Sequence, residues 1–363
     1  MPTRADGKIG VREYASVLLL SVGLRMTDST PSIYFQLGYS AAWVIPLASY
    51  ILLGTSFMVM LSLLKKHRNK GLVDLVFALT GRFGGTVIAF TLFLLMLLIT
   101  VVSARNYTDI LNMMVFQLTT LPALLLMLLG TSLYVASRGI ETIGRTAWIV
   151  IPYIEVAVFA LIAFVWEEVE WYHLFPIAGP GVHKLLMDSV RYSSFFGEII
   201  LFTAFFPLLR SYKAYRTASY IGFGISCFKI CIMLTVFVAV YDYPAVMNLE
   251  FPFQQLTRSA SIGGIVTHIE SVFLAFWLIS TVIHFAIYLF LLAILLGQTL
   301  RLQSIGRLLA PLAGLILLLA MLPTNLTLIR PYWDMVHAFA SILFLALPYI
   351  LWSADRMKRW FKG

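Results

Sequence analysis

The sequence predicts an all-α integral membrane protein with about ten membrane-spanning helices. Composition is the first reason: of 363 residues, 60% are hydrophobic and 12% are charged, and the mean hydropathy is +0.90. A soluble globular protein has roughly 25% charged residues. The second reason is that the apolar residues form runs separated by short polar segments. Because each run has roughly the 20 residues that cross a bilayer, each is expected to form a helix.

The expected spans follow one another without an insertion long enough for a domain outside the membrane. We therefore expect one polytopic domain over residues 1–363. The spans are expected at about 13–35, 41–64, 84–108, 120–136, 147–166, 184–209, 218–241, 266–296, 308–324 and 333–352.

Two of these spans carry residues that a continuous helix in hydrocarbon avoids. The first contains SVGLRMTDSTPS, which places Arg25, Asp28 and Pro31 among apolar neighbours. An unpaired charge in the bilayer costs on the order of 3 kcal/mol or more. The sixth contains SSFFGE at residues 193–198, with two serines, a glycine and an acid midway along the span. We therefore expect both helices to be broken.

The positions of the broken spans predict an internal repeat. Spans one and six hold the same place in two halves of five helices, at about 13–166 and 184–352. Because five is odd, the second half has the opposite orientation in the membrane, which gives a five-plus-five inverted repeat. In secondary transporters such broken helices form a ligand site near the bilayer midplane. The alternative is an intact first helix in which Arg25 pairs with Asp28 and the glycines allow close packing.

The net charge of +9 indicates cytoplasmic loops rather than a nucleic-acid surface. Basic residues gather in short clusters between the spans, as in KKHRNK at 65–70 and DRMKRWFKG at 355–363. With both termini in the cytoplasm, most of the 26 Lys and Arg residues lie on that side, as the positive-inside rule requires. We expect cytoplasmic N- and C-termini and no nucleic-acid partner.

Further ionisable residues lie inside or at the ends of the apolar spans. Glu155 in the fifth span and Lys229 in the seventh are candidates for ion coupling, with a structural ion pair as the alternative. Arg105 and Asp109, one turn apart at the end of the third span, are candidates for a gate or a structural pair. Glu198 is a candidate to cap a half-helix, to bind a substrate ammonium or to titrate.

No motif in the sequence predicts an enzyme, a metal site or a cofactor. HExxH, GxSxG and the P-loop pattern do not occur, and the six histidines are scattered. The two cysteines, Cys227 and Cys231, lie one helical turn apart in an apolar run, where reduced, buried thiols are expected.

Three stretches resemble the GerAB-type spore germination permeases, a family of the amino acid–polyamine–organocation superfamily. They are FFGEIILFTAFFPLL in the sixth span, SARNYTDI at the end of the third, and LEFPFQQLTRSASIGGIVTHIESVFLAFWLIS leading into the eighth. The resemblance covers nearly the whole chain. It implies a small-molecule site at the unwound parts of spans one and six.

Matched residue by residue, the family's breaks fall on two sets of three residues. These are Val22, Gly23 and Leu24 in the first span, and Phe195, Phe196 and Gly197 in the sixth. The chain departs from the superfamily in one respect. A Gly-x-Gly followed by apolar residues is usual there, whereas here Gly23 is followed by Arg25 and Asp28. Arg25 is therefore a candidate to bind a ligand carboxylate directly, and the ligand's identity stays open.

The resemblance implies a germinant-receptor subunit of the permease type. Such a subunit binds a small nutrient, here expected to be an amino acid, at the broken helices. It then signals to partners in the bacterial inner (cytoplasmic or inner spore) membrane, which are expected to be a membrane subunit and a lipoprotein. Two alternatives remain open: a proton-coupled amino-acid transporter, and an ion-conducting subunit of a larger complex.

Overall fold

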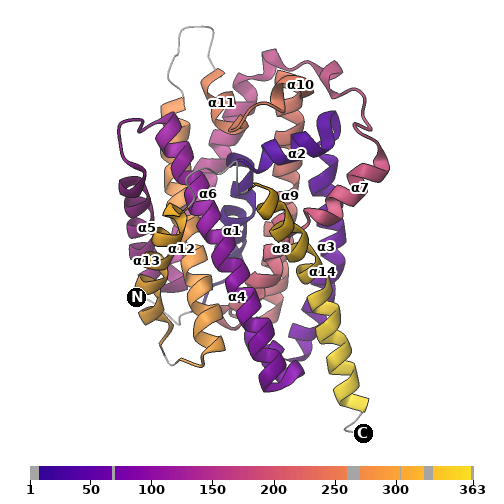
Figure 1. Ribbon diagram of the computed structural model, residues 1–363, viewed down its shortest axis with the longest axis vertical. Helices are drawn as coiled ribbons and strands as arrows, with labels where there is room; N and C mark the ends of the chain where they lie inside the picture. Colours follow the sequence, from indigo (N-terminus) through magenta and orange to yellow (C-terminus); the bar gives the residue numbers. More distant parts are fainter. Residues whose placement is uncertain (1–7, 68–69, 260–269, 303, 323–329, 361–363) are drawn as a thin grey trace.

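The computed structural model describes residues 8–67, 70–259, 270–302, 304–322 and 330–360 (Figure 1). These residues form a bundle of α-helices and short 3-10 helices, and an isolated β-bridge joins Ile9 to Leu209. The all-helical prediction is confirmed for this part of the chain.

Within the described ranges, six helices are long and apolar enough to cross a membrane. They are α3 (Val44–Lys66), α4 (Leu72–Met114), α6 (Gly139–Phe164), α9 (Tyr212–Tyr241), α12 (Glu270–Thr299) and α14 (Arg330–Trp360). Two shorter apolar helices, α5 (Leu121–Ser137) and α13 (Leu309–Met321), and two interrupted spans accompany them. This inventory is consistent with the expected ten. Helices α4, α6 and α14 extend well beyond the expected boundaries, because hydropathy detects only their apolar middle.

The first span is broken, as predicted. It consists of α1 (Val11–Ser21), the 3-10 helix η1 (Gly23–Thr27) and α2 (Thr30–Gly38). Between η1 and α2 the backbone of Asp28 is extended, and its Oδ1 accepts a hydrogen bond of 2.6 Å from the Thr30 N–H. Pro31 lies in the first turn of α2, where a missing N–H leaves no helical hydrogen bond unmade.

The sixth span is also broken, but the predicted position of its break is wrong. It consists of α7 (Val182–Arg191), α8 (Ser194–Leu201) and the 3-10 helix η5 (Phe202–Leu208). The interruption falls before Ser194, so the expected break at 195–197 is helical. The reason lies in α14, where the Ser341 hydroxyl accepts a hydrogen bond from the Ser194 N–H (2.8 Å) and donates one to the Arg191 carbonyl (2.7 Å). A distant side chain thus satisfies the backbone groups that the break releases.

Gly197 was expected to lie in the break, but it lies within α8 and allows close helix packing. A Cβ at this position would overlap the ring of Phe344, so the glycine allows α8 to lie directly against α14. In α4, Gly81 has a φ of +80°, which favours glycine, and it joins a short first segment to the long third span.

Helix α1 lies at the centre of the bundle, where every residue from Tyr14 to Ser21 is buried (Figure 1). One end of the bundle brings together the end of α3 and the end of α14 through Lys66 and Asp355, whose Nζ and Oδ2 are 2.6 Å apart. Gly71, just before α4, lies against Pro207 of η5 at this end, which is also where Ile9 pairs with Leu209.

Short helices complete the connections. At the opposite end lie η2 (Tyr39–Ala41), η3 (Trp166–Glu168), η4 (Trp171–Leu174), α10 (Tyr243–Val246) and α11 (Pro252–Ser259), and η6 (Ile305–Leu308) joins α12 to α13.

Candidate functional site

A buried ion pair joins the two broken spans. Arg25 of η1 donates from Nη2 to Oε1 of Glu198 in α8, and the two side chains are 8% and 0% exposed. The other carboxylate oxygen of Glu198 accepts a hydrogen bond of 2.6 Å from the hydroxyl of Tyr288 in α12. The structure thus brings together two residues predicted for the site. Tyr288 was missed, because one tyrosine in an apolar helix carries no distinctive sequence signal.

The alternative in which Arg25 pairs with Asp28 inside an intact helix is wrong. Because η1 is a 3-10 helix and the backbone of Asp28 is extended, the two side chains contact different partners. Arg25 turns toward α8 and Asp28 caps the start of α2.

The guanidinium of Arg25 is not fully satisfied by the protein. It lies 5.4 Å from the centre of the Phe195 ring, a cation–π distance. Its Nε is buried and has no hydrogen-bond partner among the described residues. Since buried polar groups are almost always paired, this unpartnered donor is unusual and makes Arg25 a candidate ligand contact.

A pocket of about 430 Å³ opens beside Arg25, and we call it the polar pocket. This volume lies in the range of roughly 300–1,000 Å³ that is typical of small-molecule sites. Ten of its sixteen lining residues are polar or charged, and the lining comes from the first span, α4, α8, the segment after α10 and α14. The lining residues are Arg25, Asp28, Ser29, Thr30, Ser32, Ile33, Gln36, Val102, Ser103, Asn106, Phe195, Met247, Asn248, Leu249, Glu250 and Trp333.

Hydrogen bonds hold the break of the first span against its neighbours around the polar pocket. Asn106 of α4 donates to the Ser29 hydroxyl at 2.7 Å, and the Ser32 hydroxyl donates to the Leu249 carbonyl at 2.6 Å. With Arg25 neutralised by Glu198, the other charged residues of this lining, Asp28 and Glu250, are acids. The charged groups that line the pocket are therefore one guanidinium, already paired with Glu198, and two carboxylates.

Helix α14 supports the other side of the polar pocket. His337 Nδ1 lies 2.9 Å from the Ser194 hydroxyl, and its ring is 4.3 Å from the ring of Phe195. Trp333, one turn earlier, packs its ring 4.8 Å from His337 and reaches the pocket. The last helix thus positions Phe195, a role for which its sequence carried no signal.

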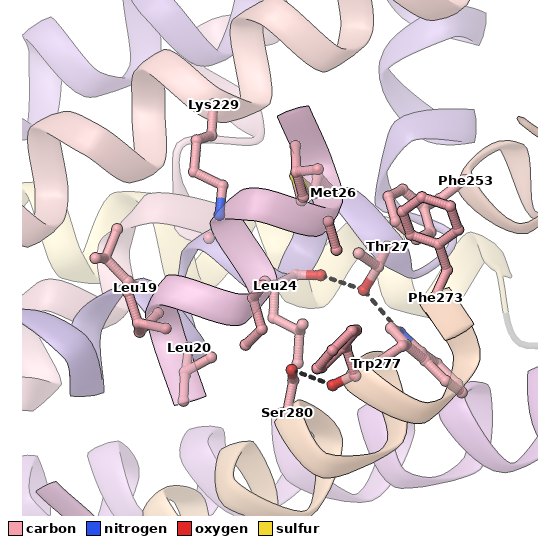
Figure 2. A pocket seen from close by; sticks show the side chains of 16 residues that line it. Leu19, Leu20, Leu24, Met26, Thr27, Lys229, Phe253, Phe273, Trp277 and Ser280 are labelled. Atoms are coloured by element: carbon pink, nitrogen blue, oxygen red, sulfur yellow. Dashed lines mark hydrogen bonds between the residues drawn. The ribbon is translucent and has the colours of Figure 1, made fainter. Parts of the chain in front are cut away.

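A second pocket lies on the other side of η1, and we call it the apolar pocket (Figure 2). It is small, about 30 Å³, which is close to the volume of one water molecule. Trp277 donates to the Thr27 hydroxyl at 3.0 Å, and this hydroxyl donates to the Leu24 carbonyl at 2.7 Å, so the chain of bonds fixes the 3-10 turn. Because of its size, the apolar pocket is a poorer candidate for a nutrient than the polar pocket.

Lys229 of α9 lines the apolar pocket (Figure 2). Its ammonium lies 2.7 Å from Oε1 of Glu155. The expected pair is therefore formed, and its coupling role stays a prediction. Arg105 and Asp109 also pair, at 3.0 Å, and Arg105 donates to the Ala320 carbonyl of α13. Neither pair lines the polar pocket.

The remaining predicted residues pack rather than face the polar pocket. Gly23 and Leu24 line the apolar pocket, and Val22 is fully buried. Phe196 packs edge to face against Phe223 of α9, with ring centres 5.7 Å apart. Both cysteines are free, with sulfur atoms 4.0 Å apart.

A membrane-spanning helical bundle with two broken spans that meet beside a polar pocket is an arrangement typical of permeases and transporters. Comparison with solved structures finds a similar fold. The fold is similar to that of a Na⁺-coupled sialic acid symporter in a substrate-bound, outward-open state, with a TM-score of 0.63 and 9% sequence identity. The match covers 97% of this chain and 79% of the symporter.

Residues 20–329 match the spore permease family, described as "Spore germination protein", and the chain belongs to this family. The resemblance found in the sequence is confirmed. Two relatives come from Bacillus subtilis (strain 168). Spore germination protein KB is 21% identical over 190 residues, which are 51% of each chain, so the match spans about half of that relative. Spore germination protein YndE is 22% identical over 321 residues, 87% of each chain.

Proposed function

We propose that this chain is a permease-like subunit of a spore germinant receptor that binds a small nutrient in the polar pocket. The observation that carries the proposal is the Arg25–Glu198 pair. It joins the two broken spans at the edge of the pocket and leaves the Nε of Arg25 open. A ligand at this point contacts both spans at once. Its binding can therefore change their relative position and signal to other subunits.

An amino acid fits the charges of the polar pocket. The open edge of Arg25 suits a carboxylate, because a guanidinium can donate two parallel hydrogen bonds to it. The acidic residues nearby, Asp28 and Glu250, make the pocket attractive to a ligand that carries an ammonium group. The partners we propose, a membrane subunit and a lipoprotein, are those that the resemblance to germination permeases implies, and family membership supports this setting.

The proposed placement is the bacterial inner membrane with both termini in the cytoplasm. The end of the bundle that holds Lys66, His67 and Arg359 is basic, as a cytoplasmic face is. We further propose that the chain is one domain of two inverted repeats, about 13–166 and 184–352, because both broken spans begin a set of five. A proton-coupled amino-acid transporter is the second candidate, favoured by the Lys229–Glu155 pair in the bundle.

A thermal-shift screen of the detergent-purified protein tests the proposal. Amino acids, sugars and nucleosides are added in turn, and a ligand of the folded state raises the melting temperature as its concentration rises. We expect amino acids to give the shift and Arg25→Ala to abolish it. Lys229→Met is the matched control, because it removes another charge of the bundle, partly buried and paired, that does not line the polar pocket, and it should keep the shift.

Two outcomes would contradict the proposal. One is the absence of any nutrient-dependent shift in the wild-type protein, alone and with its partner subunits. The other is an unchanged shift in Arg25→Ala. Uptake of the same ligand into proteoliposomes, driven by a pH gradient, would favour the transporter over the receptor.

A further inference from the structure

The protein itself uses only part of the Arg25 guanidinium. Nη2 donates to Glu198 and lies 3.5 Å from the Tyr288 hydroxyl, whereas Nε has no partner among the described residues. Nε and Nη2 lie on one edge of the guanidinium, and a carboxylate can bind such an edge with both oxygens. Glu198 binds Nη2 with one oxygen and leaves Nε without a partner among the described residues.

Glu198 has a second anchor that does not depend on Arg25. Its Oε2 accepts the 2.6 Å hydrogen bond from Tyr288, so the carboxylate keeps a charge-assisted bond when the guanidinium leaves. Glu198 is nevertheless fully buried, and a buried charge that loses its counter-charge is strongly destabilising. A ligand that displaces Glu198 from Arg25 must therefore bring a positive charge of its own.

We propose that Glu198 is a built-in competitor for the ligand's carboxylate at Arg25, and that the ligand is a zwitterion that inserts into this ion pair. The inference rests on the proposed function and deepens it. The ligand carboxylate binds Nε and Nη2 of Arg25 from the polar pocket. The ligand ammonium then takes the place of the guanidinium beside Glu198. One buried ion pair becomes two, and no charge is left unpaired.

Insertion of the ligand also explains how its binding moves the helices. Arg25 belongs to η1 and Glu198 to α8, so a ligand between them must separate the two broken spans. Helix α8 lies directly against α14 at Gly197, where even a Cβ would overlap Phe344. A shift of α8 is therefore passed to α14, which runs to the far end of the molecule and ends in the ion-pair cluster around Asp355.

An acetate titration of the purified full-length protein tests the competitor role without a known nutrient. The melting temperature is measured in sodium acetate and in sodium chloride of equal ionic strength. Glu198→Gln keeps the shape of the side chain but removes the competing charge. We expect this variant to bind acetate at least about tenfold more tightly than the wild type, as is typical when a like-charged competitor is removed from a buried site. The double variant Arg25→Gln/Glu198→Gln is the matched control and should show no acetate-specific shift.

Glu198→Asp provides a second variant. It shortens the competing carboxylate by one methylene group, so its affinity for acetate should lie between those of the wild type and Glu198→Gln. If Glu198→Gln does not yield folded protein, the acetate titration is done with Glu198→Asp instead. For each amino acid that stabilises the wild type, the corresponding amide and the corresponding acid without the amino group should fail to do so.

The outcomes separate this inference from the proposed function. An equal acetate response in the wild type, Glu198→Gln and the double variant overturns the competitor role, even where amino acids bind. An acetate response that requires both Arg25 and the loss of the Glu198 charge supports it, even where the nutrient screen is negative and the proposed function fails. Binding of a nutrient that lacks either charged group, as tightly as the amino acid, overturns insertion of a zwitterion.

Discussion

At the residue scale, the centre of the molecule holds one basic and one acidic side chain that are removed together from water. Such a pair contributes little net stability, because the loss of hydration offsets most of the attraction between the charges. Arg25 and Glu198 are therefore better explained by a role in binding than by a role in holding the bundle together. Tyr288 supports this role by fixing the carboxylate while leaving one edge of the guanidinium open.

The energetics of the Arg25–Glu198 pair give a first prediction. Arg25→Leu leaves Glu198 buried without its counter-charge and should lower the free energy of unfolding by about 3–5 kcal/mol. Arg25→Leu/Glu198→Leu removes both charges and should recover most of this loss. Denaturation of the detergent-purified variants measures the difference. Equal or additive losses in the single and double variants would show that the two charges do not depend on each other.

At the element scale, distant side chains help to complete both broken spans. In the first, Asp28 accepts a hydrogen bond from the nearby Thr30 N–H, while Gln254 and Tyr107 donate to the carbonyls of Thr27 and Leu24. The break of the sixth is closed by Ser341 of α14, which lies 147 residues beyond Ser194. The last helix is therefore a structural part of the sixth span, and it also carries Trp333 to the polar pocket and His337 to Phe195.

Removal of the Ser341 hydroxyl gives a second prediction. Ser341→Ala leaves the Ser194 N–H and the Arg191 carbonyl without this partner, and each buried unsatisfied group costs about 1–3 kcal/mol. The melting temperature should fall clearly. Ser132→Ala is the matched control, because the equally buried Ser132 hydroxyl donates only to Leu128 within its own helix. If both substitutions lower the melting temperature equally, Ser341 does not bridge the break.

At the scale of the whole molecule, the ends of the bundle differ in charge. One end holds the basic cluster around Lys66 and Arg359, and the opposite end exposes the acidic residues Glu167, Glu168 and Glu170. Lys and Arg are enriched in cytoplasmic loops, so the basic end is expected to face the cytoplasm.

This orientation gives a third prediction. In a background with Cys227→Ser and Cys231→Ser, Lys213→Cys at the start of α9 and Glu168→Cys in η3 place single thiols at exposed positions on opposite ends. In right-side-out vesicles, a membrane-impermeant maleimide should label the Glu168→Cys variant and not the Lys213→Cys variant. Labelling of both after permeabilisation is the control. The reverse pattern would place the termini outside.

Much of the architecture could be predicted from the sequence because the signals are local. Hydropathy shows that the helices lie in a membrane and gives the approximate length of each span. The residues that break the first span are neighbours in the chain. The predicted break of the sixth span was displaced, since its position depends on a serine hydroxyl that arrives from α14. Of the predicted ligand residues, Arg25, Asp28 and Phe195 line the polar pocket, whereas Gly197 serves helix packing.

The sequence by itself determined the membrane environment, the approximate number and positions of the spans, and the family. These follow from the free energy of placing each side chain in hydrocarbon, which is a property of short segments. Only the tertiary structure decided the partner of Arg25, which is 173 residues away, and the roles of Tyr288 and Ser341. These contacts depend on which helices lie side by side, and the packing of distant helices is not encoded in any one stretch of the chain.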